Sequence, residues 1–196
     1  MWVVLQRLMA LLVQALQSDS KEKEKTMVCP NCGMLRPEDT IDCSCGWRKV
    51  IEYITLDEYF NVHRDSPEIT AKIKHNAKEL LKRVNSLLTD LKFELNDIVV
   101  TSGFRPLAYN IKVGGAKRSR HVRGLAIDIY DPTGNIYHKI VKNLGNLTSR
   151  DLSVEDGRYT PDWVHIQWPP PPSGRTIFIP YSGPPKTKKV KPGLDN

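Results

Sequence analysis

The stretch KRSRHVRGLAIDIYD spans residues 117–131 and sets the interpretation of the chain. Its second half alternates two sets of residues, Leu125, Ile127 and Ile129 against Ala126, Asp128 and Tyr130. This alternation predicts a strand whose apolar set faces a core and whose other set, with Asp128, faces the opposite side. Gly124 permits a turn that folds His121 back over that side. Imidazole and carboxylate both bind zinc, so His121 and Asp128 are predicted ligands of a catalytic metal.

A catalytic zinc needs a third protein ligand, and a second strand supplies one. Residues 163–168 read WVHIQW, so Trp163, His165 and Gln167 share a face while Val164 and Ile166 take the other. Taken singly, a histidine in an apolar strand is more often a packed residue, and an aspartate more often bonds a nearby loop. The His-x6-Asp pair followed by Trp-x-His favours a three-ligand metal site instead.

Together with Ser119, Gly124 and Ala126, the three ligands resemble the zinc D-Ala-D-Ala carboxypeptidase family, which includes phage L-alanoyl-D-glutamate endolysins. The likeness extends to TSGFR at 101–105, to Asn110, to Gly114-Gly115 and to ITLDEYF at 54–60, and covers about residues 51–182. It implies an α+β fold in which helices flank a small antiparallel sheet, as in hedgehog-like and D-Ala-D-Ala peptidases.

The resemblance also implies an activity. It is that of a zinc peptidase that cuts peptidoglycan stem peptides, either as a D-Ala-D-Ala carboxypeptidase or as an L-Ala-D-Glu type endopeptidase. A phage lysin or a virion-associated wall hydrolase would fit. Such a protein acts at the bacterial cell wall, as part of the virion or after release at lysis.

Two further roles follow from the resemblance. Arg105 is expected to hold a substrate carboxylate or the scissile carbonyl, for which a rigid guanidinium fork is suited. A solvated surface position is the ordinary alternative for an arginine. Ser119 bonds either the substrate or its own loop.

A general base must lie within hydrogen-bond reach of the attacking water. Asp162 is the first choice, because it lies three residues before His165, and this carboxylate-x-x-His spacing resembles that of the phage endolysins. Many family members carry glutamate there, which is longer by one methylene. Glu155 and Asp156 are the reserves, since the loop before the last strand brings either toward the metal.

All four cysteines lie in two close pairs, at Cys29, Cys32, Cys43 and Cys45. The pattern predicts a structural zinc ribbon or knuckle over residues 27–50, because four thiolates fill every ligand position. Disulfides in an exported protein are the alternative. Bridges within such close pairs would be strained, which favours zinc and a chain made in a reducing cytoplasm. The expected cofactors are therefore one catalytic and one structural Zn²⁺.

The two ends of the chain differ from the middle. Residues 1–17 are apolar with polar interruptions, which predicts an amphipathic helix; residues 2–16 would dock on a protein partner or self-associate. A signal peptide or a membrane-surface anchor is the alternative. Residues 18–26 form a charged linker, and residues 183–196 a basic tail that is expected to be disordered.

Other elements follow from local patterns. Thr55 and Glu58 form a capping box that opens a short helix, and Ser66-Pro67 is the expected start of a long core helix. That helix carries an apolar stripe at Ile69, Ile73, Ala77, Leu80, Leu81, Val84, Leu87, Leu88 and Leu91. Strands are expected at 98–101, 152–156 and 176–179, and a helix at 135–144.

Bulk composition narrows the classes of function. The chain has 196 residues, which suits one medium domain with small additions, and its 40% hydrophobic share is too low for a membrane protein. A net charge of +7 favours anionic partners such as cell wall or nucleic acid. Basic and aromatic residues are not interleaved, so nucleic acid is disfavoured. A non-catalytic virion or wall-binding protein and a zinc-knuckle nucleic-acid binder are the competing functions, and the intact His-Asp-His set favours the peptidase.

Overall fold

The computed structural model describes residues 26–38 and 42–180. The chain divides into two compact units, and the boundary between them falls between Lys49 and Val50. The predicted helix over residues 1–17, nearly all of the linker at 18–26 and the basic tail at 183–196 lie outside the described residues. Those three predictions stay predictions.

The smaller unit contains a hairpin and two tight turns. Strand β1 (Thr26–Val28) pairs antiparallel with β2 (Leu35–Pro37), with Val28 opposite Leu35. The carbonyl of Cys29 accepts a hydrogen bond from the Gly33 N–H at 2.8 Å, and the carbonyl of Cys43 accepts one from the Gly46 N–H at 2.9 Å. Each cysteine pair therefore belongs to its own tight turn.

The larger unit is built on a five-stranded sheet with strand order β3-β4-β6-β5-β7. The strands are β3 (Val100–Ser102), β4 (Ala126–Tyr130), β5 (Ser153–Glu155), β6 (Trp163–Gln167) and β7 (Ile177–Phe178). All neighbouring pairs are antiparallel except β5 and β7, which run parallel. The predicted α+β class with a small, mainly antiparallel sheet is confirmed. The strand expected at 176–179 is the edge strand β7, and its parallel direction is the feature that the sequence did not indicate.

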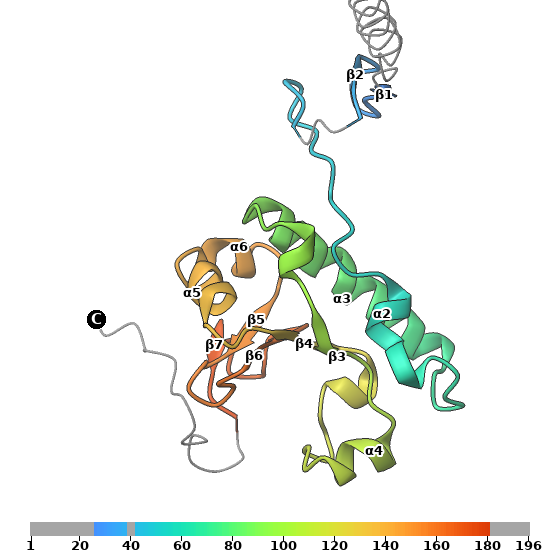
Figure 1. The fold of residues 1–196 in the computed structure, drawn as a ribbon, viewed down its shortest axis with the longest axis vertical. Coiled ribbons are helices and arrows are strands. Elements are labelled where there is room, and N and C mark those ends of the chain that lie inside the picture. The colour runs from blue at the N-terminus through green and yellow to red at the C-terminus, as the bar shows by residue number, and fades with distance from the viewer. Residues whose placement is uncertain (1–25, 39–41, 181–196) are drawn as a thin grey trace, which may run out of the picture. The chain divides into compact units, whose positions relative to one another are not determined.

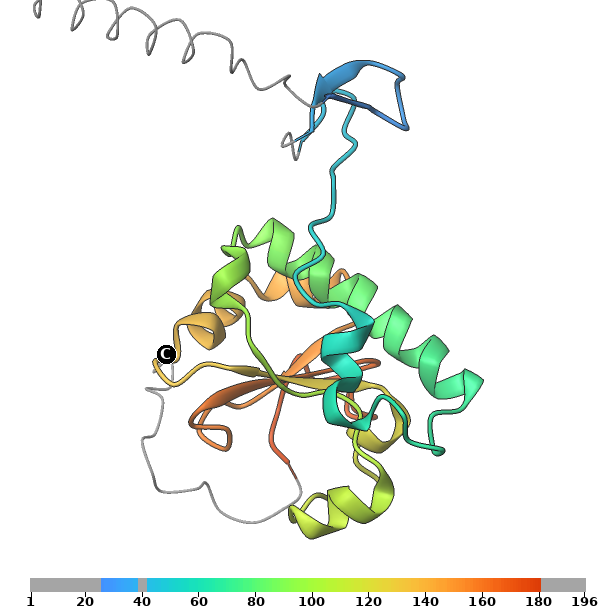
Figure 2. The same cartoon turned by 45° about the vertical axis from the view of Figure 1, so that its right-hand side comes forward.

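Helices surround this sheet. They are α2 (Leu56–Phe60), α3 (Ala71–Asp90), α4 (Leu107–Lys112), α5 (Asn135–Val141) and α6 (Leu144–Thr148), with short 3₁₀ turns η1 (Asn61–His63), η2 (Leu95–Asp97) and η3 (His121–Arg123). In both views of the ribbon, α3 lies above the sheet and α4 lies below it (Figures 1 and 2). The helix expected over 135–144 is two helices, because the chain turns at Lys142 and Asn143.

The core lies between α3 and one face of the sheet. The predicted stripe of α3 supplies Leu80, Val84, Leu87 and Leu88, each with no measurable exposure, and the sheet supplies Ile127, Ile129, Val154, Val164 and Ile166. The sheet residues are the apolar half of each alternating strand. Burying this half leaves the other half, with Asp128 and His165, on the opposite face.

Two helix starts test the capping predictions. The capping box at Thr55 and Glu58 is present: the Thr55 hydroxyl accepts the Glu58 N–H, and the Glu58 carboxylate accepts the Thr55 N–H. The long helix begins at Ala71 rather than at Ser66-Pro67. Thr70 is its N-cap, because its hydroxyl accepts the Ile73 N–H at 3.3 Å. A second capping residue four positions downstream therefore overrode the Ser-Pro signal.

Among residues 26–38 and 42–180, the structure contains no helix with the length and apolar character needed to cross a bilayer.

Packing of α3 against the sheet predicts a specific loss of stability. Leu87→Ala removes a fully buried side chain, so the free energy of unfolding of the larger unit is expected to fall by about 2–5 kcal/mol. Leu95→Ala is the matched control, because Leu95 is 56% exposed and its truncation leaves no cavity. Urea unfolding followed by circular dichroism measures both, and equal shifts in the two variants would contradict this account of the core.

Candidate functional site

Strands β4 and β6 bring two polar side chains directly opposite each other. Asp128 pairs with His165, flanked by the pairs Ala126 with Gln167 and Tyr130 with Trp163. Directly opposed residues of an antiparallel pair have side chains on the same face, about 5 Å apart at Cβ. The core occupies the other face, so the sheet presents an aspartate and a histidine side by side.

His121 reaches this pair from a short turn. It opens η3, which ends at Gly124 in the left-handed conformation with φ +71°. A Cβ at Gly124 would lie 2.8 Å from the Ile73 carbonyl oxygen, so both the conformation and the close approach require glycine. The Ser119 hydroxyl accepts the His121 N–H at 3.3 Å. Ser119 thus makes the loop bond that was one of its two expected roles.

The three side chains converge on one small volume. His121 Nε2 lies 3.2 Å from His165 Nδ1 and 3.3 Å from Asp128 Oδ1, and His165 Nδ1 lies 2.8 Å from Asp128 Oδ1. Ligands about 2.0–2.1 Å from a tetrahedral ion would be roughly 3.3–3.4 Å apart, so this triangle is close to one face of a tetrahedron. Two imidazoles and one carboxylate are also the donor types of a catalytic zinc site. The residues therefore fit a metal ion.

Burial and mutual contacts set the charge of these groups. Burial by itself would raise the pKa of the Asp128 carboxyl, but the charges of His121 and His165 and their hydrogen bonds together lower that pKa. Burial lowers the pKa of His121, although Asp128 opposes it. Asp128 is thus held ionised and His121 is held neutral, which are the forms that donate lone pairs to a metal.

The environment of His165 differs from that of His121. Burial would lower its pKa, but the hydrogen bond to Asp128, the charge of Asp128 and the charge of Glu155 outweigh burial and raise it. The ring also meets the Phe178 ring edge to face, with the two centroids 5.9 Å apart. Glu155 is thus close enough to His165 to act on it electrostatically.

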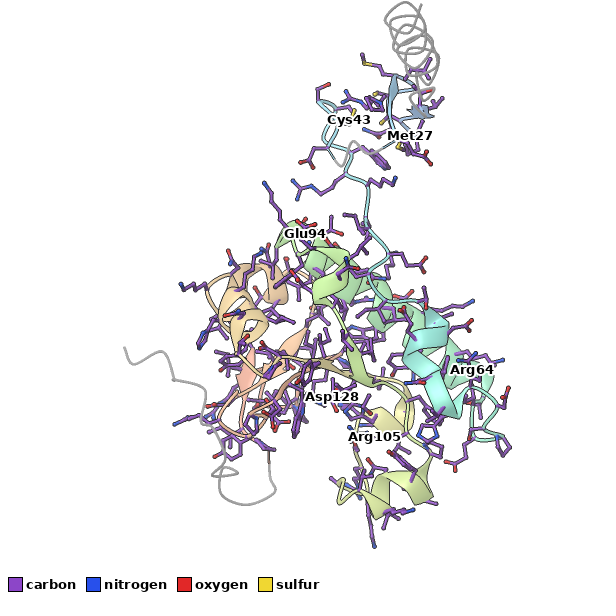
Figure 3. The ribbon with its side chains drawn as sticks, viewed as in Figure 1. Met27, Cys43, Arg64, Glu94, Arg105 and Asp128 are labelled. Carbon is purple, nitrogen blue, oxygen red and sulfur yellow. The ribbon has the colours of Figure 1, made fainter. Side chains whose placement is uncertain are left out.

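Arg105 lies beside Asp128; both residues are labelled in Figure 3. One guanidinium nitrogen, Nη2, is 2.5 Å from Asp128 Oδ2, and its Nε donates to the Ser102 hydroxyl at 2.6 Å. The Arg105 side chain is only 19% exposed. The structure therefore brings Arg105 to the site, with its guanidinium engaged by a metal-ligand candidate.

Strand register separates the three carboxylates considered for the general base. Ser153 pairs with Gln167 and Val154 with Ile166, so the register continues to Glu155 opposite His165, on the face that carries Asp128. Glu155 thus extends the Asp128–His165 row by one strand.

The other two carboxylates lie outside this row. Asp156 is bound by Arg158, with Oδ2 and Nη2 2.7 Å apart. Asp162 is exposed and precedes β6; its carbonyl accepts the Asp131 N–H at 2.9 Å, which continues the β4–β6 ladder. Asp162 lies in the turn before β6 and outside the strand, and its side chain is not among the donors that converge with His165. The structure therefore does not group Asp162 with the metal-ligand candidates.

One contact of the site is made by a backbone carbonyl, so no residue type in the sequence indicates it. His121 Nδ1 lies 2.6 Å from the backbone carbonyl oxygen of Gly103. A carbonyl only accepts, so Nδ1 carries the hydrogen and Nε2 keeps its lone pair toward the triangle. The position requires glycine, because a Cβ there would lie 2.0 Å from the Tyr59 carbonyl oxygen.

The four cysteines form a second donor group in the smaller unit. All four are free, and their sulfurs approach one another at 3.6 Å (Cys29 and Cys45), 3.6 Å (Cys32 and Cys43) and 3.0 Å (Cys43 and Cys45). Sulfurs about 2.3 Å from a tetrahedral zinc would be roughly 3.8 Å apart. This group also fits a metal, with all four positions filled by protein.

Local hydrogen bonds favour the thiolate form at one cysteine. The Asn31 side chain, then the Cys43 thiol and the Trp47 backbone, lower the pKa of Cys45 to about 6. A thiolate, not a thiol, binds metal. Cys45 is therefore poised to act as a ligand near neutral pH.

Comparison with known proteins places this site in a family. A family model described as Peptidase M15 matches residues 55–167, which is more than half of the chain. No curated protein matches the chain. Among solved structures, the Serratia marcescens L-Ala D-Glu endopeptidase ChiX is similar at 23% identity, with 53% of this chain and 92% of that chain covered and a TM-score of 0.35.

The matched segment holds the complete His121, Asp128 and His165 triangle together with Arg105 and Glu155. This result confirms the resemblance on which the sequence interpretation was based. The chain belongs to the peptidase M15 family.

Proposed function

We propose that the protein is a zinc peptidase that hydrolyses peptide bonds in peptidoglycan stem peptides. The observation that carries this proposal is the triangle of Nε2, Nδ1 and Oδ1 donors of His121, His165 and Asp128, with edges of 2.8–3.3 Å. Three protein donors leave one side of a four-coordinate ion for water and substrate, which a purely structural site does not need. Membership of the peptidase M15 family agrees with this chemistry.

The three metal-ligand candidates would supply the following chemistry. Zn²⁺ held by the triangle would polarise the scissile carbonyl and lower the pKa of a coordinated water to about 7. When bound to the metal, His121 and His165 would both be deprotonated and contribute neutral nitrogens, and Asp128 would contribute one negative charge, so a bound dication would keep a net positive charge.

We propose Glu155 as the general base in preference to Asp162. Its carboxylate lies on the strand next to His165 and on the same face, and it raises the pKa of that histidine. From there it can accept the proton of the attacking water and later return a proton to the leaving amine. Asp162 has the family-like spacing in sequence, but it lies in an exposed turn before β6 and outside the row of Asp128, His165 and Glu155.

A basic loop favours an anionic substrate. Lys117, Arg118 and Arg123 are exposed on the segment that leads into and through η3, next to the ligand His121. Stem peptides carry free carboxylates, which such a rim attracts through long-range electrostatics. This argument supports a wall peptide as substrate, and the choice between a terminal and an internal peptide bond is left to experiment.

The cysteine group is proposed as a structural zinc site. Four sulfurs leave no coordination position for a substrate, so its role is to hold the small unit together. Zinc-binding cysteines are typical of a reducing compartment, so we propose synthesis in the cytoplasm before the protein acts at the cell wall as a lysin or a virion-associated hydrolase.

Digestion of purified peptidoglycan tests the function. The wild-type protein is expected to release muropeptides, identified by mass spectrometry, and a chelator or His165→Ala is expected to abolish release. Zinc restored after chelation should restore activity of the wild type and not of the variant. Peptidoglycan that stays intact with zinc-loaded wild-type protein would leave a non-catalytic wall-binding role.

Substitution of single carboxylates tests the base. Glu155→Gln is expected to lower kcat by about 10²–10⁴-fold while zinc content is kept, because the amide cannot accept the proton. Asp162→Asn is the matched control and should retain activity within a few-fold. A severe loss in Asp162→Asn with little loss in Glu155→Gln would reverse the assignment.

Metal counting tests whether the two donor groups are independent. The wild-type chain is expected to hold two zinc ions. Cys32→Ser should lose one and destabilise only the smaller unit, and His121→Ala should lose the other without unfolding the larger unit. Atomic emission on dialysed protein measures both, and disulfides found in place of the first ion would refute the structural site.

A further inference from the structure

One loop contacts two of the three metal-ligand candidates. Residues 102–105 read Ser-Gly-Phe-Arg; Ser102 is the last residue of β3, and the others lead toward α4. The Gly103 carbonyl oxygen lies 2.6 Å from His121 Nδ1, and Arg105 Nη2 lies 2.5 Å from Asp128 Oδ2. In addition, the Arg105 N–H donates to the His121 carbonyl at 3.3 Å.

The two carboxylate oxygens of Asp128 have different partners because of Arg105. Oδ2 accepts from the guanidinium, while Oδ1 faces the two imidazoles at 2.8 and 3.3 Å. A carboxylate with one oxygen bound in this way offers only the other to a metal. Asp128 is 6% exposed, so no bulk water competes for Oδ2.

The guanidinium is itself held in place. Its Nε donates to the Ser102 hydroxyl at 2.6 Å, three residues earlier in the same loop. The loop is fixed in turn against α2, because the Phe104 N–H donates to the Tyr59 carbonyl and a Cβ at Gly103 would lie 2.0 Å from that oxygen. Arg105 is therefore a preorganised partner of Asp128.

We propose that Arg105 is a positioning residue, which acts through Asp128 to make it a one-oxygen ligand and so sets the affinity and geometry of the metal centre. This differs from the role of substrate anchor that the sequence implied. It rests on the proposed zinc site, and it adds that the loop at 102–105 orients two ligands at once. Substitution of a residue that hydrogen-bonds a metal ligand typically lowers metal affinity or activity by about 10–100-fold.

Metal binding without substrate tests the proposal. The experiment uses the full chain carrying Cys32→Ser, so that only the His-Asp-His centre is titrated. Arg105→Ala is expected to weaken zinc binding about 10–100-fold in competition with a fluorescent chelator, and to alter the visible spectrum of the Co²⁺-loaded centre. Arg105→Lys keeps the charge but not the fork that reaches both Ser102 and Asp128, so an intermediate loss is expected.

Arg123→Ala is the matched control. It removes an equal charge from an exposed side chain that lies two residues from His121 in the sequence. Its zinc affinity should stay within about threefold of the parent, since solvent screens such a charge. Circular dichroism verifies that each variant is folded.

The outcomes separate this inference from the function itself. A parent protein that binds no zinc would remove the proposed function and the inference with it. A parent that binds zinc, with Arg105→Ala equal in zinc affinity and Co²⁺ spectrum and raised only in KM on wall peptides, would overturn the inference alone. Loss of zinc affinity and of kcat with KM kept would support it.

Discussion

The site depends on one constraint, the register between β4 and β6. Asp128 and His165 meet because they are directly opposed in an antiparallel pair whose other face is buried against α3. A shift of one residue in either strand would move its whole polar set into the core, so hydrophobic burial and ligand placement are specified by the same pattern. Stability of the core therefore maintains the geometry of the site.

Around this pair, the protein has to keep a charged carboxylate away from water. Asp128 is almost fully buried, which by itself opposes ionisation, but the charges and hydrogen bonds of the two imidazoles lower its pKa. Arg105 also pairs with the carboxylate. The cluster is satisfied internally through a backbone carbonyl, a guanidinium and a serine hydroxyl. A buried group paired on every side is rigid, and rigidity is what a centre with one open coordination position requires.

Much of this structure could be predicted from local patterns in the sequence. Strict alternation in two short strands was sufficient to predict which face Asp128 and His165 occupy, and the turn at Gly124 accounted for His121. Contacts made by the backbone were out of reach, since the Gly103 carbonyl has no residue signature. The nearness of Glu155 to His165 was also out of reach, because it arises from the pairing of β5 with β6, which sequence distance does not encode. Sequence spacing favoured Asp162, which lies in the turn before β6.

The two donor groups of the chain differ in a way that follows from their ligands. Four sulfurs surround an ion completely and leave it no chemistry beyond holding turns together. Two nitrogens and one oxygen form a single triangular face, so a tetrahedral ion bound there would keep one coordination position that the protein does not fill. The first group draws its ligands from two turns close in sequence, and the second draws them from three elements brought together by the sheet. A metal bound to the cysteines would therefore stabilise the small unit, whereas the larger unit must fold first in order to bring its three donors together.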